Sequence, residues 1–294
     1  MTRRAVLAAL AASLARAAGR LPANRNVRWA VSANLWASIP GVVFTDILDV
    51  MRDTGFIGIR VTQFPRILAT YHTTVPQMEK ELSARNLHVI TISFDGPAHD
   101  PARRAEYLDS ARRAMEFLKN FGADRLVVFS PARSNGTTPH AFQNMCEGFN
   151  QLGALAGEMG FRAGLHNHLG QMVQNGDEVD RCMALTNPKV FGLAPDTAHL
   201  HLAGADVVKT IGKYKDRLAM LDYKDARQAS SRFLDNIFDL GDGEIDFPAC
   251  HRILKSIAYK GWICVDLDTA RRGPRVSYER CGAYVVNHLE PIYA

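Results

Sequence analysis

The sequence predicts a single-domain α/β protein with a (β/α)8 TIM barrel fold. Apolar segments rich in Val, Ile, Leu and Phe alternate with helical segments eight times, which indicates a parallel sheet. Within these segments apolar and polar residues barely alternate, as expected of strands buried on both faces. The chain has 294 residues, and barrels of this kind usually need about 250. The alternative, an open doubly wound sheet, would place a glycine-rich phosphate-binding turn after an early strand, and the sequence has none.

Eight segments have the composition and length of buried strands. They are residues 27–35, 56–61, 87–94, 125–129, 161–166, 190–194, 217–221 and 261–265. No linker, low-complexity tract or change of composition divides the chain after residue 27. We therefore expect one barrel domain over residues 27–294.

Capping signals mark the helices between these strands. Asp100 is placed as an N-cap, Pro101 occupies the first helical position and Gly122 follows the helix end. Thr74 and Gln77 have the spacing of a capping box. We expect helices near residues 43–54, from 74 onward, and at 101–121, 139–159, 177–186, 206–214, 248–258 and 277–289.

The first 17 residues have the pattern of an export signal. Arg3 and Arg4 precede a short apolar run at 5–15, and residues 15–17 (Ala-Arg-Ala) resemble a small-residue cleavage site. Paired arginines are typical of the twin-arginine route, and the apolar run is too short to span a bilayer. We expect a periplasmic or otherwise exported protein. The alternative is a cytoplasmic protein that retains this segment as an amphipathic helix.

Charge and cysteine content exclude some classes of function. Without residues 1–17, which contain three arginines and no acidic residue, the formal net charge falls from +5 to +2. No run of Lys or Arg indicates a nucleic-acid surface. The five cysteines are odd in number and widely spaced, so we expect core residues rather than a disulfide framework or a zinc site. The oligomeric state stays open, with a homo-oligomer possible.

Polar clusters follow the last four predicted strands. They are His166 with His168, Asp196 with His199, Asp222 with Lys224 and Asp225, and Asp266 with Asp268. Each cluster also has a structural explanation, such as helix capping by Asp196 or salt bridges around Lys224. However, the C-terminal ends of barrel strands converge on one face, and burying several carboxylates without a cation is costly. Together the clusters predict a metal-centred active site.

These residues resemble the xylose-isomerase-like barrels, which include sugar isomerases and epimerases, inosose dehydratases and dehydroshikimate dehydratases, with apurinic endonucleases as distant relatives. The resemblance extends from about Val27 to the C-terminus. It is carried by residues 165–168, 196–200, 223–225, 241–247 and 261–266. Residues 171–174 and 178–181 look most like inosose dehydratase.

The resemblance implies one divalent ion, often manganese, held by Glu, Asp, His and Glu from strands five to eight. This chain has His166, Asp196, Asp222 and Asp266 at those positions, so only Asp196 matches. One imidazole and three carboxylates are nevertheless retained. Mn²⁺ is the first expectation, and Mg²⁺, Co²⁺, Zn²⁺ or Fe²⁺ would also suit this ligand set.

The chemistry that fits such a site is proton abstraction next to a carbonyl group. His168 and His199 are the candidate acid and base, because the reference pKa of histidine lies near neutrality. Lys224 is the candidate group for stabilising the oxyanion or donating a proton.

Further residues are candidates for binding the substrate. Trp36 and Phe94, at the ends of the first and third predicted strands, could form an apolar wall. Asp225 and Asp268 could contact substrate hydroxyls, and Arg271, just beyond the last strand, could hold substrate oxygens. Residues 241–247 are predicted to form a tight loop over the site, because their glycines permit unusual backbone angles.

The first functional hypothesis is a metal-dependent isomerase or epimerase that acts on a non-phosphorylated sugar or keto-polyol through an enediolate. Export argues against a phosphorylated substrate. The alternative is a lyase, either of the inosose dehydratase type or one that eliminates a group from a keto-glycoside. A third hypothesis, from another class, is a non-catalytic periplasmic sugar-binding barrel.

Overall fold

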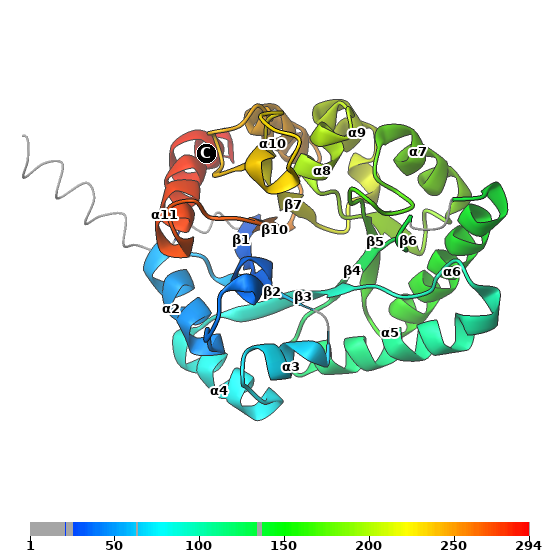
Figure 1. The fold of residues 1–294 in the computed structure, drawn as a ribbon, viewed down its shortest axis with the longest axis horizontal. Helices are drawn as coiled ribbons and strands as arrows, with labels where there is room; N and C mark the ends of the chain where they lie inside the picture. The colour runs from blue at the N-terminus through cyan, green and yellow to red at the C-terminus, as the bar shows by residue number, and fades with distance from the viewer. Residues whose placement is uncertain (1–20, 22–25, 63, 134–136, 294) are drawn as a thin grey trace, which may run out of the picture.

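A closed parallel barrel forms the body of the protein (Figure 1). The computed structural model describes residues 21, 26–62, 64–133 and 137–293. Eight parallel strands follow the order β6-β5-β4-β3-β2-β1-β10-β7. Isolated parallel bridges, Leu193 with Leu218 and Asp196 with Asp222, join the two edges of this sheet. This closure confirms the predicted (β/α)8 barrel.

The barrel strands are short and almost entirely buried. They are β1 (Val27–Ser32), β2 (Gly58–Val61), β3 (His88–Phe94), β4 (Arg125–Phe129), β5 (Arg162–His166), β6 (Phe191–Leu193), β7 (Leu221–Tyr223) and β10 (Gly261–Val265). Beyond β7 the chain forms a small antiparallel hairpin, β8 (Asp225–Ala226) with β9 (Ile237–Phe238).

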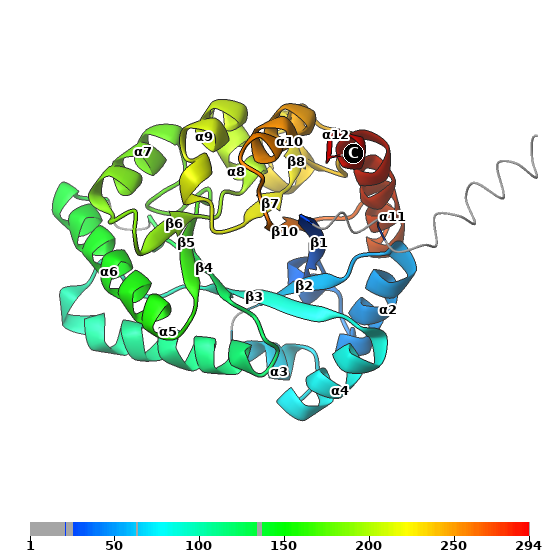
Figure 2. The ribbon, with the colours of Figure 1, turned by 180° about the vertical axis from the view of Figure 1, so that it is seen from behind.

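Helices surround the strands as a ring, as the views from both sides show (Figures 1 and 2). The α-helices are α2 (Phe44–Thr54), α3 (Arg66–Thr70), α4 (Val75–Arg85), α5 (Arg104–Lys119), α6 (Pro139–Glu158), α7 (Gly176–Leu185), α8 (Thr197–Leu202), α9 (Val207–Lys213), α10 (Phe247–Ser256), α11 (Pro274–Tyr284) and α12 (Glu290–Tyr293). Short 3-10 turns are η2 (Ala33–Ser38), η3 (Pro101–Arg103), η4 (Lys215–Arg217) and η5 (Phe233–Asn236), and a π-helical turn, η6 (Val285–Leu289), follows α11. None of the described helices combines the length and apolar character needed to cross a membrane.

The predicted caps are confirmed. The hydroxyl of Thr74 accepts a hydrogen bond from the backbone N–H of Gln77, and α4 begins at the next residue after Thr74. The carboxylate of Asp100 accepts from the N–H of Ala102, and the chain passes through η3 before α5 begins. The predicted signal at residues 1–17 lies outside the described residues.

Two predicted strands have a boundary that is wrong by three residues or more, and the other differences are of one or two residues. The first strand ends at Ser32, whose hydroxyl accepts from the N–H of Asn34 and starts the η2 turn. The seventh strand begins at Leu221, not at Arg217. Arg217 lies in η4, where its guanidinium donates to the carbonyl oxygens of Met183 and Phe191 at 2.6 and 2.8 Å. These hydrogen bonds connect Arg217 to α7 and β6. Arg217 therefore lies outside the strand that the apolar pattern predicted.

Apolar side chains of different sizes fill the barrel below the polar end of the strands. They are Ala30, Ile90, Val127, Ala194, Met220, Trp262 and Cys264. Gly58 makes room for the Trp262 indole, because a Cβ at this position would lie 2.6 Å from the ring. All five cysteines are buried and free, which confirms that they are core residues. Because these side chains fill the interior of the barrel, a polar site has room at the C-terminal ends of the strands.

Candidate active site

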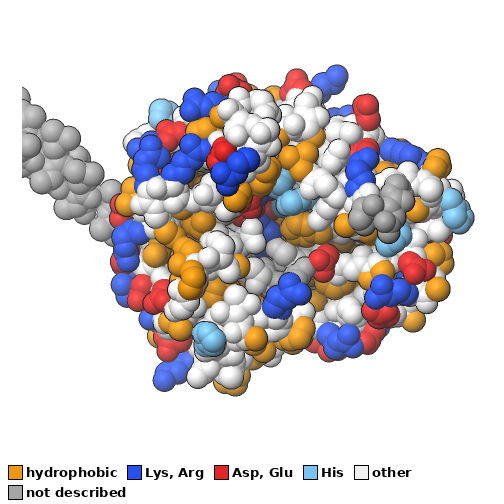
Figure 3. All heavy atoms as spheres, viewed as in Figure 1, with side chains coloured by type: hydrophobic (Ala, Val, Ile, Leu, Met, Phe, Trp, Pro, Cys, Tyr) orange, Lys and Arg blue, Asp and Glu red, His pale blue; other side chains and the backbone are white. Residues whose placement is uncertain are grey.

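A polar cavity of about 320 Å³ opens at the C-terminal ends of the strands. Arg60, His166, His168, Lys224 and Asp268 are among the residues that line it. The space-filling view shows this face hollowed at its centre (Figure 3). The cavity lies where the sequence predicted it, because side chains at the ends of parallel barrel strands converge there.

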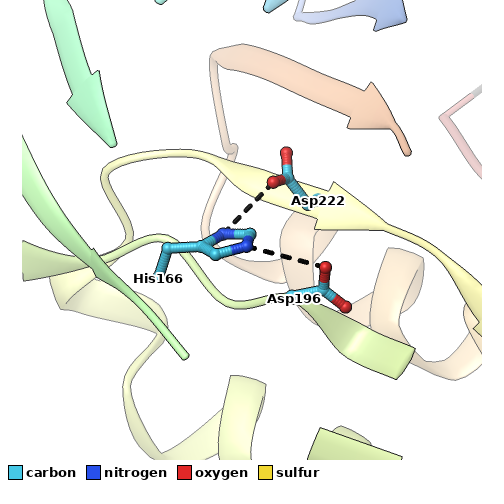
Figure 4. Close-up of side chains that lie close together, drawn as sticks. All are labelled: His166, Asp196 and Asp222. Carbon is cyan, nitrogen blue, oxygen red and sulfur yellow. Dashed lines mark ion pairs between the residues drawn. The ribbon is translucent and has the colours of Figure 1, made fainter. Parts of the chain in front are cut away.

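Three of the four predicted metal ligands come together beside this cavity. One ligand atom from each of His166, Asp196 and Asp222 lies within 4.8 Å of the other two. All three side chains are at most 1% exposed. Asp196 and Asp222 are neighbours because their backbones form the bridge that closes the barrel, and His166 points between them from the end of β5 (Figure 4).

Four atoms of this group make no hydrogen bond with the described part of the chain, although two of them lie near buried cations: Asp196 Oδ2 is 3.0 Å from the Lys224 ammonium and Asp222 Oδ2 is 3.4 Å from Arg60. Among the described residues, His166 Nδ1, Asp196 Oδ2 and both oxygens of Asp222 are buried without a hydrogen bond. Unsatisfied buried polar atoms are rare because each one costs desolvation free energy. Their convergence fits a divalent cation, whose ligands lie about 2.0–2.6 Å away from it.

The position of His166 adds a second argument for a cation. Its Nδ1 lies 3.2 Å from Asp222 Oδ2, and its Nε2 lies 3.7 Å from Asp196 Oδ2. Burial holds the pKa of His166 well below its usual value, so the imidazole is neutral. A neutral imidazole has one N–H, so in either tautomer the other nitrogen turns a lone pair toward a carboxylate. A cation between the two would remove this repulsion.

Lys224 is a buried cation among carboxylates. Its Nζ lies 2.7 Å from Asp268 Oδ2, 2.8 Å from Asp266 Oδ2 and 3.0 Å from Asp196 Oδ2. Burial acts to lower the pKa of Lys224, but the three carboxylates outweigh it and raise the pKa well above its usual value. The ammonium group therefore stays charged at the wall of the cavity.

Arg60 on β2 is a second buried cation, and the sequence analysis missed it. Its guanidinium lies 2.7 Å from Asp266 Oδ2 and 3.4 Å from Asp222 Oδ2, and it donates to the hydroxyls of Ser32 and Ser93. The side chain is 3% exposed. A signal was present, because Arg60 is the one charged residue in a strand of sequence Gly-Ile-Arg-Val.

Asp266 was predicted as the fourth metal ligand, and it lies outside the group of three, although its Oδ1 is likewise buried without a hydrogen bond to the described residues. Its Oδ2 faces both Arg60 and Lys224, and it does not belong to the group formed by His166, Asp196 and Asp222. Although burial acts to raise its pKa, these two cations hold the pKa of Asp266 well below its usual range. Asp266 therefore bridges the two buried cations.

Charge balance within this buried cluster leaves an excess of negative charge. Four carboxylates (Asp196, Asp222, Asp266 and Asp268) face two cations (Arg60 and Lys224). When all four carboxylates are ionised, the excess is two negative charges, which equals in size the charge of one divalent ion. Burial raises the pKa of Asp222 to about 7, so without a further cation this carboxylate resists ionisation.

The two candidate acid–base histidines differ in the role of Nδ1, which donates a hydrogen bond in His168 and accepts one in His199. Nδ1 of His168 lies 2.8 Å from the carbonyl oxygen of Leu169, so it carries the hydrogen and Nε2 has the lone pair. Nδ1 of His199 accepts from the N–H of Leu169, and its Nε2 lies 3.9 Å from Asp196 Oδ2. His168 lines the cavity, whereas His199 is fully buried behind it. His168 is therefore the better placed base, and it is the backbone N–H of His199 that holds Asp196, by donating to its Oδ1 at 3.1 Å.

Of the residues predicted to bind substrate, only Asp268 lines the cavity. Trp36 is buried and stacks on Tyr278 at 5.4 Å, so it is a packing residue. Arg271 lies over the Phe238 ring and donates to the carbonyl oxygen of Asp235. Phe94 lines a neighbouring cavity instead.

Asp225 is also directed away from the cavity. Its carboxylate accepts from the backbone N–H groups of Gly241, Gly243 and Ile245, at 2.8, 3.0 and 3.3 Å. Gly241 has a φ of +87°, and a Cβ at Gly243 would overlap Asp225. Asp225 therefore holds the predicted tight loop in place, and the glycines make the close approach possible. None of residues 241–247 lines the cavity, so the structure does not place this loop over the site as predicted.

The profile of the xylose isomerase-like TIM barrel family matches residues 48–280. An inosose dehydratase of Bacillus velezensis is 32% identical over 222 residues, which cover 65% of this chain and 72% of the relative. An inosose dehydratase of Lactiplantibacillus plantarum is 24% identical over 299 residues, covering 91% and 98%. Both relatives are named inosose dehydratase, and dehydratases are lyases.

The solved structures include the IolI protein with a bound zinc atom. It superposes with a TM-score of 0.77 at 13% identity, covering 91% of this chain and 99% of that chain, which shows the shared fold. The comparisons support an enzyme, and they favour the lyase alternative over the isomerase or epimerase predicted first. The chain belongs to the xylose isomerase-like TIM barrel family.

Proposed function

We propose that the protein is a metal-dependent lyase that removes water from a non-phosphorylated cyclic keto-polyol of the inosose type. The observation that carries this proposal is the convergence, at the edge of a polar cavity, of buried ligand atoms from His166, Asp196 and Asp222 that make no hydrogen bonds with the described residues. The likeness to inosose dehydratases over most of the chain favours elimination over isomerisation.

Electrostatics at the cavity support a neutral substrate. Both deep cations are matched by carboxylates, since Arg60 faces Asp222 and Asp266 while Lys224 faces three aspartates. A phosphate group beside Arg60 and Lys224 would meet carboxylates that already pair with both of these cations. Hydroxyl groups, in contrast, can accept from the ammonium and guanidinium groups and donate to the carboxylates.

His166, Asp196 and Asp222 would hold the ion, which when bound would supply a Lewis acid for the carbonyl oxygen of the substrate and its neighbouring hydroxyl. Nε2 of His168 has a lone pair at the cavity and takes the proton from the carbon next to the carbonyl. The imidazolium then returns this proton to the departing hydroxyl group, so water leaves. The Lys224 ammonium donates a hydrogen bond to oxygen that gains negative charge.

Incubation of the full chain with Mn²⁺ and an inosose in D₂O tests this function. Elimination predicts an enone chromophore and a mass loss of one water. Deuterium incorporation without mass loss would instead support isomerisation or epimerisation. Saturable binding of the inosose without deuterium exchange or mass change would support the non-catalytic sugar-binding alternative and contradict the proposal.

Removal of single ligands is expected to weaken metal binding. Loss of residues that merely orient metal ligands costs roughly 10–100-fold in affinity, so His166→Ala and Asp222→Asn should each cost about 100-fold or more. Calorimetric titration with Mn²⁺ measures this change. Asp266→Asn should have a smaller effect, because Asp266 faces Arg60 and Lys224.

Surface changes of the same type serve as controls. His140→Ala and Asp109→Asn alter exposed residues on α6 and α5, and affinity should not change. Equal losses for Asp266→Asn and Asp222→Asn would indicate the four-ligand set. Unchanged affinity in both His166→Ala and Asp222→Asn would exclude this metal site.

A further inference from the structure

A second cavity of about 290 Å³ adjoins the polar cavity of the active site. The two cavities share Arg66, Ser93 and Asp95 as lining residues, so they meet at a common wall. The second one, the side cavity, is further lined by Phe64, Pro65, Phe94, Ser110 and Arg113. The side cavity nearly doubles the space beside the catalytic groups.

Two aromatic rings form a fixed apolar surface in the side cavity. Phe64 stacks on Phe117 with ring centres 4.5 Å apart, and Phe94 packs against Tyr107 at 5.5 Å. Phe117 and Tyr107 belong to the buried face of α5. Because core residues support both rings, this surface is formed before any ligand binds, which lowers the entropic cost of binding.

Polar groups surround these rings. Arg113 pairs with Asp109 and donates to the Ser110 hydroxyl. The guanidinium of Arg66, at the wall common to both cavities, has no ion pair or hydrogen bond with the described part of the chain. An apolar floor with donors at its rim suits a ring that carries a few hydroxyl or ether oxygens.

A six-membered keto-polyol does not need this second space. The polar cavity alone lies at the lower end of the ~300–1,000 Å³ typical of small-molecule sites, and a single ring is a small ligand. The side cavity begins directly beside the polar cavity. A group expelled from a substrate bound in the polar cavity has room in the side cavity. This geometry suits a substrate whose leaving group is larger than water.

We propose that the side cavity binds the alcohol part of a keto-glycoside, so that the enzyme expels a ring-bearing alcohol as well as water. The inference rests on the proposed α-proton abstraction. In a glucoside oxidised at C3, the proton leaves C2, a C1–C2 double bond forms and the C1–O bond breaks. The released alkoxide takes up one proton, so the products are the alcohol and a cyclic enone, with no net oxidation or reduction.

Benzyl and methyl 3-keto-β-glucosides provide the test, because both release alkyl alcohols of similar acidity and differ mainly in size. We expect the full chain with Mn²⁺ to favour the benzyl compound in kcat/KM. Ser110→Trp should fill the side cavity and reduce the benzyl-to-methyl ratio by about 10-fold or more, as expected when a pocket loses room for an apolar group. Ser83→Trp, at an exposed position of α4, is the matched control and should keep the ratio.

The outcomes separate this inference from the proposed function. Water loss from the inosose without release of benzyl alcohol would overturn the inference and keep the dehydratase. The same benzyl-to-methyl ratio in Ser110→Trp and in the unmodified protein would also overturn it. If neither the inosose nor any glycoside undergoes elimination, the proposed function itself fails.

Discussion

Replacing Lys224 by methionine is expected to lower the free energy of unfolding by about 3–5 kcal/mol, the usual effect of removing one partner from a buried ion pair. Lys224 is 1% exposed and its ammonium lies within 3.0 Å of Asp196, Asp266 and Asp268. Methionine fills a similar volume but leaves these carboxylates without their shared cation. Urea unfolding followed by circular dichroism measures the change.

A matched surface change and a double variant test this explanation. Lys213 pairs with Asp180 at 2.7 Å, but both side chains are about half exposed, so Lys213→Met should cost about 1 kcal/mol or less. Asp268→Asn combined with Lys224→Met should recover part of the lost stability, because one unpaired negative charge disappears. If Lys224→Met lowers the free energy of unfolding no more than Lys213→Met, the ion pairs of Lys224 do not stabilise the fold as described.

Replacing His168 by glutamine is expected to reduce kcat for elimination by about 10²–10⁴-fold, the range typical of losing a positioned general base. The reason is that Nε2 of His168 carries the free lone pair at the cavity, since Nδ1 faces the Leu169 carbonyl oxygen. Glutamine keeps a polar side chain but cannot accept the proton near neutral pH. Initial rates of enone formation measure the effect.

Two further measurements separate the role of a base from a structural role. His168→Gln should retain Mn²⁺ affinity, because His168 is not part of the group formed by His166, Asp196 and Asp222. It should also lose exchange of the substrate α-proton with D₂O. His140→Gln, at an exposed position on α6, is the control and should keep both kcat and exchange. Normal α-proton exchange in His168→Gln would assign the base to another residue.

The barrel could be predicted because each strand carries its own signal. Strands β4 and β10 begin and end at the predicted residues, since a fully buried strand needs an uninterrupted apolar run and little else. Prediction failed at Arg217, where an apolar neighbourhood suggested a strand. There the hydrogen bonds of one guanidinium with distant carbonyl groups determine the local structure.

The residues of the site were predictable to the extent that they follow strand ends. His166, Asp196 and Asp222 met as expected because parallel strands bring their C-terminal ends to one face. Arg60 was missed because the sequence of a strand does not show which other strands the side chain of its arginine contacts. In the structure its side chain reaches from β2 to Ser93 on β3 and to Asp222 on β7.

By itself, the sequence determined the eight βα units, the end of the barrel that carries the site and the supply of one imidazole, several carboxylates and a lysine there. Only the tertiary structure decided which carboxylates approach His166: Asp196 and Asp222 lie near it as well as near one buried cation each, whereas Asp266 lies between Arg60 and Lys224. The physical reason is that interactions between buried charges change steeply over a few ångströms. Those distances depend on how far side chains from separate strands reach across the barrel, which the order of residues along the chain does not encode.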